Sequence, residues 1–191
     1  MRVTVEKITD IDLAKEFLET TVHDKEFKSS LKKLDKLYLS EHSPMYSQIF
    51  IIRMYDIYSY VSTHFRTHKK NFICEQVTTN RVDRGGEKDG GRMSLVDMMI
   101  MCNAKTMIDM SLKRLCNKAD YNTKMLMSMI KEETKKVDES LYRFMVPQCI
   151  YRCGLCPEFF CCGKVKSPNF KNELREYLKG FESNYYKPEN I

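Results

Sequence analysis

The chain has 191 residues, 42% of them hydrophobic and 30% charged, which suits one soluble domain with a small appendage. Its longest apolar runs are too short to span a bilayer and its first residues lack a signal-peptide apolar region, so we expect a cytoplasmic protein without membrane contact. The net charge of +6 favours anionic ligands, but acidic and basic residues are interspersed, so a nucleotide phosphate fits as well as a nucleic acid.

The first half of the chain predicts a mixture of strands and helices. Period-two patterns and β-branched content indicate strands, whereas apolar residues at helical spacing indicate helices. In chain order, we expect a strand at 2–8, helices at 10–21 and 24–39, a strand at 48–57, a helix at 58–69 and a strand at 71–81. A loop rich in glycine and charge follows at 83–92.

Residues 93–118 predict a long helix, and we expect the rest of the chain to be organised around it. The segment is rich in methionine, and its apolar residues recur at close to the helical period. Four polar residues interrupt this apolar pattern: Asn103, Lys105, Asp109 and Arg114. The pattern leaves two interpretations open, because these side chains either face water or converge on a large ligand lying along the helix.

The remainder of the chain predicts mainly helices, at 120–136, 140–145 and 169–181. With strands early and helices late, the fold class we predict is α+β, with a small mixed or antiparallel sheet flanked by long helices. We expect residues 1–165 to form the main domain and residues 166–191 to form a C-terminal helix and tail.

Two neighbouring basic segments, HFRTHKK at 64–70 and TTNR at 78–81, are the first candidate binding site. The guanidinium group of arginine offers a fixed fork of donors that suits a phosphate, and threonine hydroxyls add hydrogen bonds. A solvated basic helix face has the same composition. The sequence therefore leaves a phosphate site and a solvated surface both open.

Five cysteines lie within fourteen residues near the C-terminal end. In a chain without a secretory signal, such a cluster suggests metal binding more than disulfides. Four thiolates can close a tetrahedral zinc site, and the candidate ligands are Cys149, Cys153, Cys156 and Cys161. No second C-x2-C pair is present, so packed, reduced thiols remain the alternative.

Motifs for nucleophilic catalysis are missing from the sequence. It contains neither the G-x-S-x-G of a serine hydrolase nor the H-E-x-x-H of a zinc protease. The polar residues described above are better suited to holding ligands than to attacking them. If the protein is an enzyme, this pattern favours one in which a bound cofactor carries the difficult step.

The methionine-rich segment resembles a pattern of the flavin-dependent thymidylate synthases, in a short form of the kind found in bacteriophages. That family carries an N-A-R segment, then an Asn, then an Arg before an A-Q pair. At the same spacing, this chain has Asn103-Ala104-Lys105, Asp109, Arg114 and an Ala-Asp pair at 119–120. The substitutions are Lys for Arg at 105 and Asp for Asn at 109.

A second resemblance to the family lies upstream, at its R-H-R-x-x-S signature and its S-x-R segment. Residues 66–71, R-T-H-K-K-N, stand where the signature belongs, and only Arg66 is kept in place, with His68 as a shifted form of the signature histidine. Thr79-Asn80-Arg81 is similar to the S-x-R segment. The family's helix before the N-A-R segment is reduced here to the glycine-rich loop, where Arg92 can substitute for its arginine.

The resemblance implies an FAD-dependent methylation at C5 of a pyrimidine nucleotide, dUMP to dTMP. Methylenetetrahydrofolate would supply the carbon and NADPH the reducing equivalents, in a homotetramer acting in the cytoplasm (the host cytoplasm for a phage protein), and a nucleic acid is not the expected partner. The implied flavin-binding residues are Arg66, His68, Asn71, Asn103, Lys105 and Asp109. The implied substrate-binding residues are Thr79, Arg81, Arg92 and Arg114, and of these Arg114 would also act catalytically at the pyrimidine ring.

Two alternatives stay open. One is a different C5 modification of a pyrimidine nucleotide, such as hydroxymethylation, on the same scaffold. The other is a non-catalytic nucleotide-binding or nucleic-acid-binding protein stabilised by a zinc knuckle.

Overall fold

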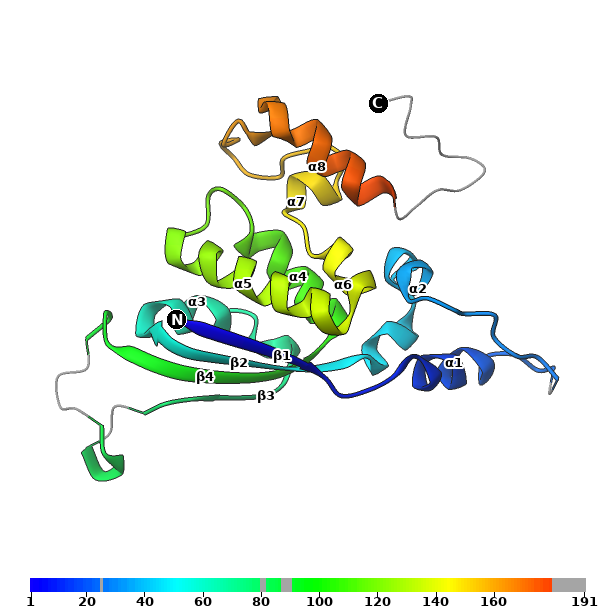
Figure 1. The fold of residues 1–191 in the computed structure, drawn as a ribbon, viewed down its shortest axis with the longest axis horizontal. Helices are drawn as coiled ribbons and strands as arrows, with labels where there is room; N and C mark the ends of the chain where they lie inside the picture. Colours follow the sequence, from blue (N-terminus) through cyan, green and yellow to red (C-terminus); the bar gives the residue numbers. More distant parts are fainter. Residues whose placement is uncertain (25, 80–81, 87–90, 180–191) are drawn as a thin grey trace.

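The computed structural model describes residues 1–24, 26–79, 82–86 and 91–179. Its centre is a four-stranded antiparallel sheet in the order β1-β2-β4-β3. The strands are β1 Arg2–Lys7, β2 Ile49–Tyr58, β3 Phe72–Val77 and β4 Leu95–Asn103. Together with the helices on one side of this sheet (Figure 1), they confirm the predicted α+β class.

The helices are arranged in layers over the sheet. The α-helices of the described residues are α1 Ile11–Glu19, α2 Asp35–Ser40, α3 Ser59–Arg66, α4 Ala104–Arg114, α5 Tyr121–Val137, α6 Glu139–Phe144, α7 Gln148–Tyr151 and α8 Pro168–Leu178. In Figure 1, α4, α5 and α6 lie directly above the sheet, and α7 and α8 lie above these helices. Across the described ranges, no helix combines the length and apolar character that crossing a membrane requires.

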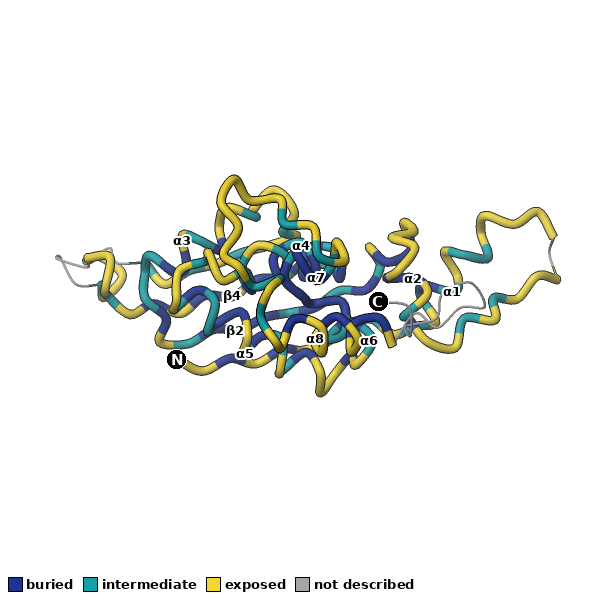
Figure 2. The backbone as a smooth tube through the Cα atoms, turned by 90° about the horizontal axis from the view of Figure 1, so that it is seen from above, coloured by how far each residue is buried: buried dark blue, intermediate teal, exposed yellow. Residues whose placement is uncertain are grey.

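One face of the sheet is covered and the other is open. The residues of β4 that face the helices are at most 4% exposed: Val96, Met98, Ile100 and Cys102. Because side chains alternate along a strand, the residues between them point to the opposite face. There, Leu95 is 57% exposed and Met99 is 42% exposed. Figure 2 shows the buried residues concentrated along β2, β4 and the helices above them.

The predicted helix over 93–118 is wrong in its first half, where residues 95–103 form β4. The side chain of Asn103 accepts a hydrogen bond from the backbone N–H of Thr106 at 2.9 Å, which caps α4 directly after the strand. Methionine occurs in both kinds of element. From Val96 to Cys102, buried residues alternate with more exposed ones, as in a strand, and β2 and β3 pair with this strand on either side. The second half of the prediction is confirmed as α4.

The predicted helix over 24–39 is also wrong, except for its last turns, which form α2. Side chains in this region bind backbone groups that a helix would need. Asp24 accepts from the backbone N–H of Glu26 at 2.9 Å, and Ser29 accepts from that of Leu31 at 3.2 Å. These local hydrogen bonds replace the helical ones. The segment extends away from the core and is mostly exposed (Figure 2).

The other predicted elements are confirmed, with shifts at their ends. The strands at 2–8, 48–57 and 71–81 match β1, β2 and β3, although residues 80–81 lie outside the described ranges. The helices at 10–21, 58–69, 120–136, 140–145 and 169–181 match α1, α3, α5, α6 and α8, although residues 180–181 lie outside the described ranges. In the predicted loop at 83–92, Val82–Arg84 forms one 3-10 turn, and residues 87–90 are not described. The division at residue 165 stays a prediction.

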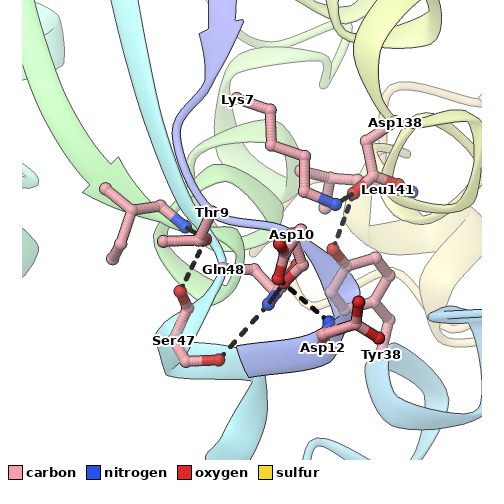
Figure 3. Close-up of polar contacts among 10 residues, drawn as sticks. Lys7, Thr9, Asp10, Asp12, Tyr38, Ser47, Gln48, Asp138 and Leu141 are labelled. Carbon is pink, nitrogen blue, oxygen red and sulfur yellow. Dashed lines mark hydrogen bonds and ion pairs between the residues drawn. The ribbon is translucent and has the colours of Figure 1, made fainter. Parts of the chain in front are cut away.

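A buried carboxylate joins β1, α2 and the start of α6 (Figure 3). Asp138 Oδ2 accepts from Lys7 Nζ at 2.7 Å and from the Tyr38 hydroxyl at 2.9 Å. Its Oδ1 accepts from the backbone N–H of Leu141 at 2.8 Å, which caps α6. Burial, together with the Asp138 carboxylate, raises the pKa of Tyr38, so its hydroxyl keeps its proton and donates.

Candidate functional site

Segment 64–71, which leads from the end of α3 to β3, lies along α4. At one end of the segment, Arg114 Nη2 donates to the backbone oxygen of His64 at 2.7 Å and to the Thr67 hydroxyl at 2.6 Å. At the other end, the Thr106 hydroxyl donates to the backbone oxygen of Asn71 at 3.0 Å. The two parts of the sequence that resemble the same family are therefore side by side in the fold.

Arg114 is the last residue of α4 and is only partly exposed to solvent. Its Nη2 is satisfied by segment 64–71, but its Nε is buried without a hydrogen-bond partner. Burial lowers the pKa of the guanidinium group. Because a buried donor without an acceptor is costly, this N–H is suited to a carbonyl or anionic group of a ligand.

His68 faces α4 from the middle of the segment. Burial is the main cause that lowers its pKa to about 4, and the positive charge of Arg114 adds to that shift, while Asp109 opposes it. The imidazole is therefore neutral near pH 7. Its Nε2 is buried and has no hydrogen-bond partner, so it is free to donate one hydrogen bond to a ligand or to accept one from it, depending on the tautomer.

The polar residues in the first half of α4 are already bound to one another or to the backbone. Asn103 caps the helix, as described above. Lys105 Nζ lies 2.6 Å from Asp109 Oδ1 and 3.4 Å from Glu41 Oε2. Burial lowers the pKa of Lys105, but the two carboxylates outweigh this effect, so the pKa is raised overall and the ammonium is retained. Lys105 and Asp109 thus form a neutralised pair at the side of α4.

A cavity of about 650 Å³ lies on the other side of segment 64–71, between α3 and β3. This volume is in the range of small-molecule sites. Its lining is mainly polar and includes Ser59, Ser62, Thr63, Arg66, Lys69, Glu75, Thr78 and Thr79. Arg66 Nε donates to Glu75 Oε1 at 3.1 Å, and Lys69 Nζ lies 3.5 Å from the same oxygen. The other carboxylate oxygen of Glu75 is buried without a partner.

Segment 64–71 therefore presents different residues to the cavity and to α4. Arg66 and Thr79 share the cavity, whereas His68 and Arg114 meet on the side of α4. Asn71 contributes its backbone oxygen to Thr106, and its side chain is exposed.

Two further predicted residues are not part of this arrangement as the structure describes it. The guanidinium carbon of Arg92 lies 5.9 Å from the centre of the Tyr60 ring, and Arg92 does not line the cavity. Arg81 lies outside the described residues.

Sequence reasoning missed Glu75 and Glu41. The partners of Glu75 are Arg66 and Lys69, on the other side of a turn, and Glu41 meets Lys105 across the fold. No spacing rule connects these positions. Thr106 was missed as well, because Asn103 is recognised as a helix cap only once the strand that precedes it is known.

The cysteines do not form a ready metal site. Within the described ranges, no group of three His, Cys, Asp or Glu side chains is placed to hold one ion, and all eight cysteines are free thiols. Cys149 is buried, whereas Cys153 and Cys161 are exposed. The zinc site predicted from Cys149, Cys153, Cys156 and Cys161 stays a prediction.

No protein-family profile and no curated protein sequence matches the chain. Solved structures do match it. The flavin-dependent thymidylate synthase from Helicobacter pylori, solved with FAD and dUMP, superposes with a TM-score of 0.62 over 76% of this chain and 100% of its own, at 12% sequence identity. The chain has the flavin-dependent thymidylate synthase fold. The UMP/dUMP methylase PolB from Streptomyces cacaoi, solved with 5-Br dUMP, matches with a TM-score of 0.52 over 75% of this chain and 94% of its own, at 13% identity.

At these identities the likeness establishes the fold and leaves the chemistry to the residues. On this fold, residues 66–71 contact α4 through Thr106, directly after the N-A-K segment at 103–105, and through Arg114. The buried atoms without partners, His68 Nε2 and Arg114 Nε, lie on that contact.

Proposed function

We propose that the protein methylates C5 of a pyrimidine nucleotide, converting dUMP to dTMP in the cytoplasm with FAD as its cofactor, methylenetetrahydrofolate as the carbon source and NADPH as the reductant. The observation that carries the proposal is the contact between segment 64–71 and α4. It joins two separately matched motifs and leaves His68 Nε2 and Arg114 Nε buried without partners. The thymidylate synthase fold supports the same reaction class.

The residues present fit a flavin. An isoalloxazine ring offers carbonyl oxygens and ring nitrogens, which match a neutral imidazole and a guanidinium N–H that lack partners. The residues that would hold the cofactor are Arg66, His68 and Asn71 of segment 64–71, together with Asn103, Lys105 and Asp109 at the start of α4. A bound FAD, once reduced by NADPH, would supply the hydride that completes the methyl group.

Arg114 would act on the substrate. Its Nη2 is anchored to segment 64–71 by two short hydrogen bonds, so the remaining N–H groups are held in a fixed orientation. A fixed guanidinium donor beside a pyrimidine carbonyl would stabilise the negative charge that develops on the oxygen as C5 becomes nucleophilic. Thr79, which lines the cavity together with Arg66, would bind the nucleotide phosphate. The family resemblance assigns Arg81 and Arg92 to the substrate as well.

We include a homotetramer in the proposal, and the open face of the sheet supports it. Leu95, Met99 and Ile73 are between 42% and 57% exposed on the strands that border this face. Such an apolar surface is typical of an interface between subunits.

A non-catalytic nucleotide-binding role is favoured by one observation. The Arg66 guanidinium already pairs with Glu75, which Lys69 also approaches, so the signature arginine is partly neutralised within the chain. A different C5 modification on the same scaffold is compatible with the altered signature as well.

The deciding experiment is incubation of the purified protein with FAD, NADPH, methylenetetrahydrofolate and dUMP, followed by mass analysis of the nucleotide. The expected product carries one added CH2 at C5. A product bearing a hydroxymethyl group supports the other modification. Unchanged dUMP, with the nucleotide still bound by the protein in equilibrium dialysis, contradicts the enzyme and supports the binding role. Yellow colour of the purified protein, with flavin absorbance, is the accompanying check on the cofactor.

A further inference from the structure

Five cysteines from three parts of the chain line one small cavity beyond the end of α4. Its volume is about 10 Å³, close to the least space that one water molecule needs. The lining residues with thiols are Cys116, Cys149, Cys156, Cys161 and Cys162. Cys116 follows α4, Cys149 is on α7, and the others belong to the connection between α7 and α8. The fold therefore adds Cys116 to the group that was recognised from spacing.

Three of these sulfurs receive backbone hydrogen bonds of the same kind. The N–H of Lys118 donates to Cys116 Sγ at 3.5 Å, and the N–H of Gly163 donates to Cys161 Sγ at 3.4 Å. In both cases the donor stands two residues after the cysteine. Hydrogen bonds to sulfur from nearby backbone amides favour the thiolate and tune metal centres that thiolates bind.

Cys156 repeats this arrangement. The backbone N–H of Glu158, again two residues later, donates to its sulfur, and the Cys156 and Cys161 thiols share a hydrogen bond. The contact with Cys161 brings two candidate ligands together. Gly163, at a φ of 80°, allows the chain to turn sharply after Cys162, where a side chain would be strained.

Cys153 is excluded by its position. It does not line the cavity, and its thiol is instead close enough to the Tyr177 ring hydroxyl to contribute to a raised pKa there, after burial as the main cause. Cys153 itself has a φ of 51° and is exposed. It lies in the turn that follows α7.

We propose that Cys116, Cys149, Cys156 and Cys161 bind one zinc ion, which ties the connection between α7 and α8 to the end of α4. No three of these side chains are yet arranged around a common point within the described ranges, so binding requires rotation of the thiols into the cavity that they line. Four thiolates and zinc give the tetrahedral coordination typical of structural sites. The proposal goes beyond the methylation reaction and does not depend on it.

The charge of such a site is partly compensated by Lys164, which also lines the cavity. Four thiolates around one Zn²⁺ leave a net charge of −2, so a neighbouring ammonium is favourable. Lys164 Nζ is held 2.6 Å from Glu173 Oε2 on α8, and its side chain is 14% exposed. The lysine therefore stays beside the thiols.

The test is a Co²⁺ titration of reduced, metal-free full-length protein, with zinc content measured in the protein as purified. One Co²⁺ per chain should bind and produce the strong thiolate-to-metal absorption of a four-sulfur site. Cys116→Ser should weaken Co²⁺ binding by more than about tenfold, since altering even the groups around metal ligands has effects of that size. Cys153→Ser is the matched control and should bind as the unchanged protein does.

Circular dichroism of each variant separates loss of the ligand from loss of the fold. If Cys116→Ser does not fold, Cys161→Ser decides, because that side chain is exposed and its removal leaves the core intact. The proposal is overturned by any of three results: no bound metal, full Co²⁺ affinity in the deciding variant, or equal weakening in Cys153→Ser. A disulfide between Cys156 and Cys161 in reduced buffer, seen as two fewer reactive thiols, would also overturn it.

Discussion

His68 should make the stability of the protein sensitive to mild acid. Its pKa is lowered to about 4 in the folded chain, against 6.5 for an ordinary histidine, and burial is the main cause. At pH values below 6.5 the unfolded chain takes up a proton at this position and the folded chain does not. The free energy of unfolding therefore falls as the pH is lowered from 6.5 to 4, and this contribution is constant above 6.5.

The size of the effect follows from the shift. Two and a half pKa units correspond to about 3 kcal/mol at full value, and partial exposure of the ring reduces this to about 1–2 kcal/mol. Urea unfolding at pH 7.5 and pH 4.5 measures it, with His68→Gln as the variant that cannot titrate. The unchanged protein should lose about 1–2 kcal/mol more than the variant. Equal losses in both proteins would refute the buried, neutral imidazole.

A proton NMR titration provides a second reading of the same site. The chain has four histidines, so the His68 signal is assigned as the one that His68→Gln lacks. Arg114 is the second cause of the lowered pKa, so Arg114→Ala should raise the pKa of His68 towards 6.5 without reaching it, because burial remains. An unchanged His68 pKa in that variant would show that the guanidinium group is not beside the ring.

Three further changes test other parts of the fold. Arg114→Ala should lower kcat for nucleotide methylation by about 10²–10³, the effect of losing one fixed donor at a developing oxyanion, whereas the exposed neighbour Lys113→Ala should retain turnover; a normal kcat in Arg114→Ala contradicts its role. Asp138→Ala leaves Lys7 and Tyr38 without their acceptor and should reduce the free energy of unfolding by about 3–5 kcal/mol. Calorimetry should show a fall in Tm of about 6–20 °C. The control is Glu139→Ala, which removes an exposed ion pair with Arg143. If Asp138→Ala lowers Tm no more than this control does, the prediction is wrong. Glu75→Gln frees Arg66 and should tighten dUMP binding by roughly fivefold, about 1 kcal/mol, in calorimetric titration; unchanged or weaker binding counts against a phosphate at the cavity.

Much of the fold could be predicted from the sequence where one pattern dominates. The β-branched run of β2 and the periodic apolar residues of α5 permit one interpretation each. The segment at 93–118 failed because a strand passes into a helix without a loop, and methionine is acceptable in both. Only pairing with β2 and β3, which sequence spacing does not reveal, settles the first half as a strand.

The candidate site could be predicted in its parts but not in their connections. Lys105 and Asp109 stand one helical turn apart, and that spacing alone allows the ion pair that the structure contains. The contact of Arg114 with His64 and Thr67 joins residues far apart in the sequence. Which polar groups remain without partners depends on such long-range contacts, so the sequence offered candidates and could not rank them.

The two-sided form of segment 64–71 has a consequence for the order in which ligands bind. A molecule in the cavity at Arg66 and a molecule at His68 would hold the same short stretch of backbone from opposite directions. The first ligand to bind loses binding free energy because it must immobilise that stretch. The second ligand binds to a stretch that is already ordered and does not incur this entropy cost. We therefore expect each ligand to raise the affinity for the other by an equal factor, even though the two never touch.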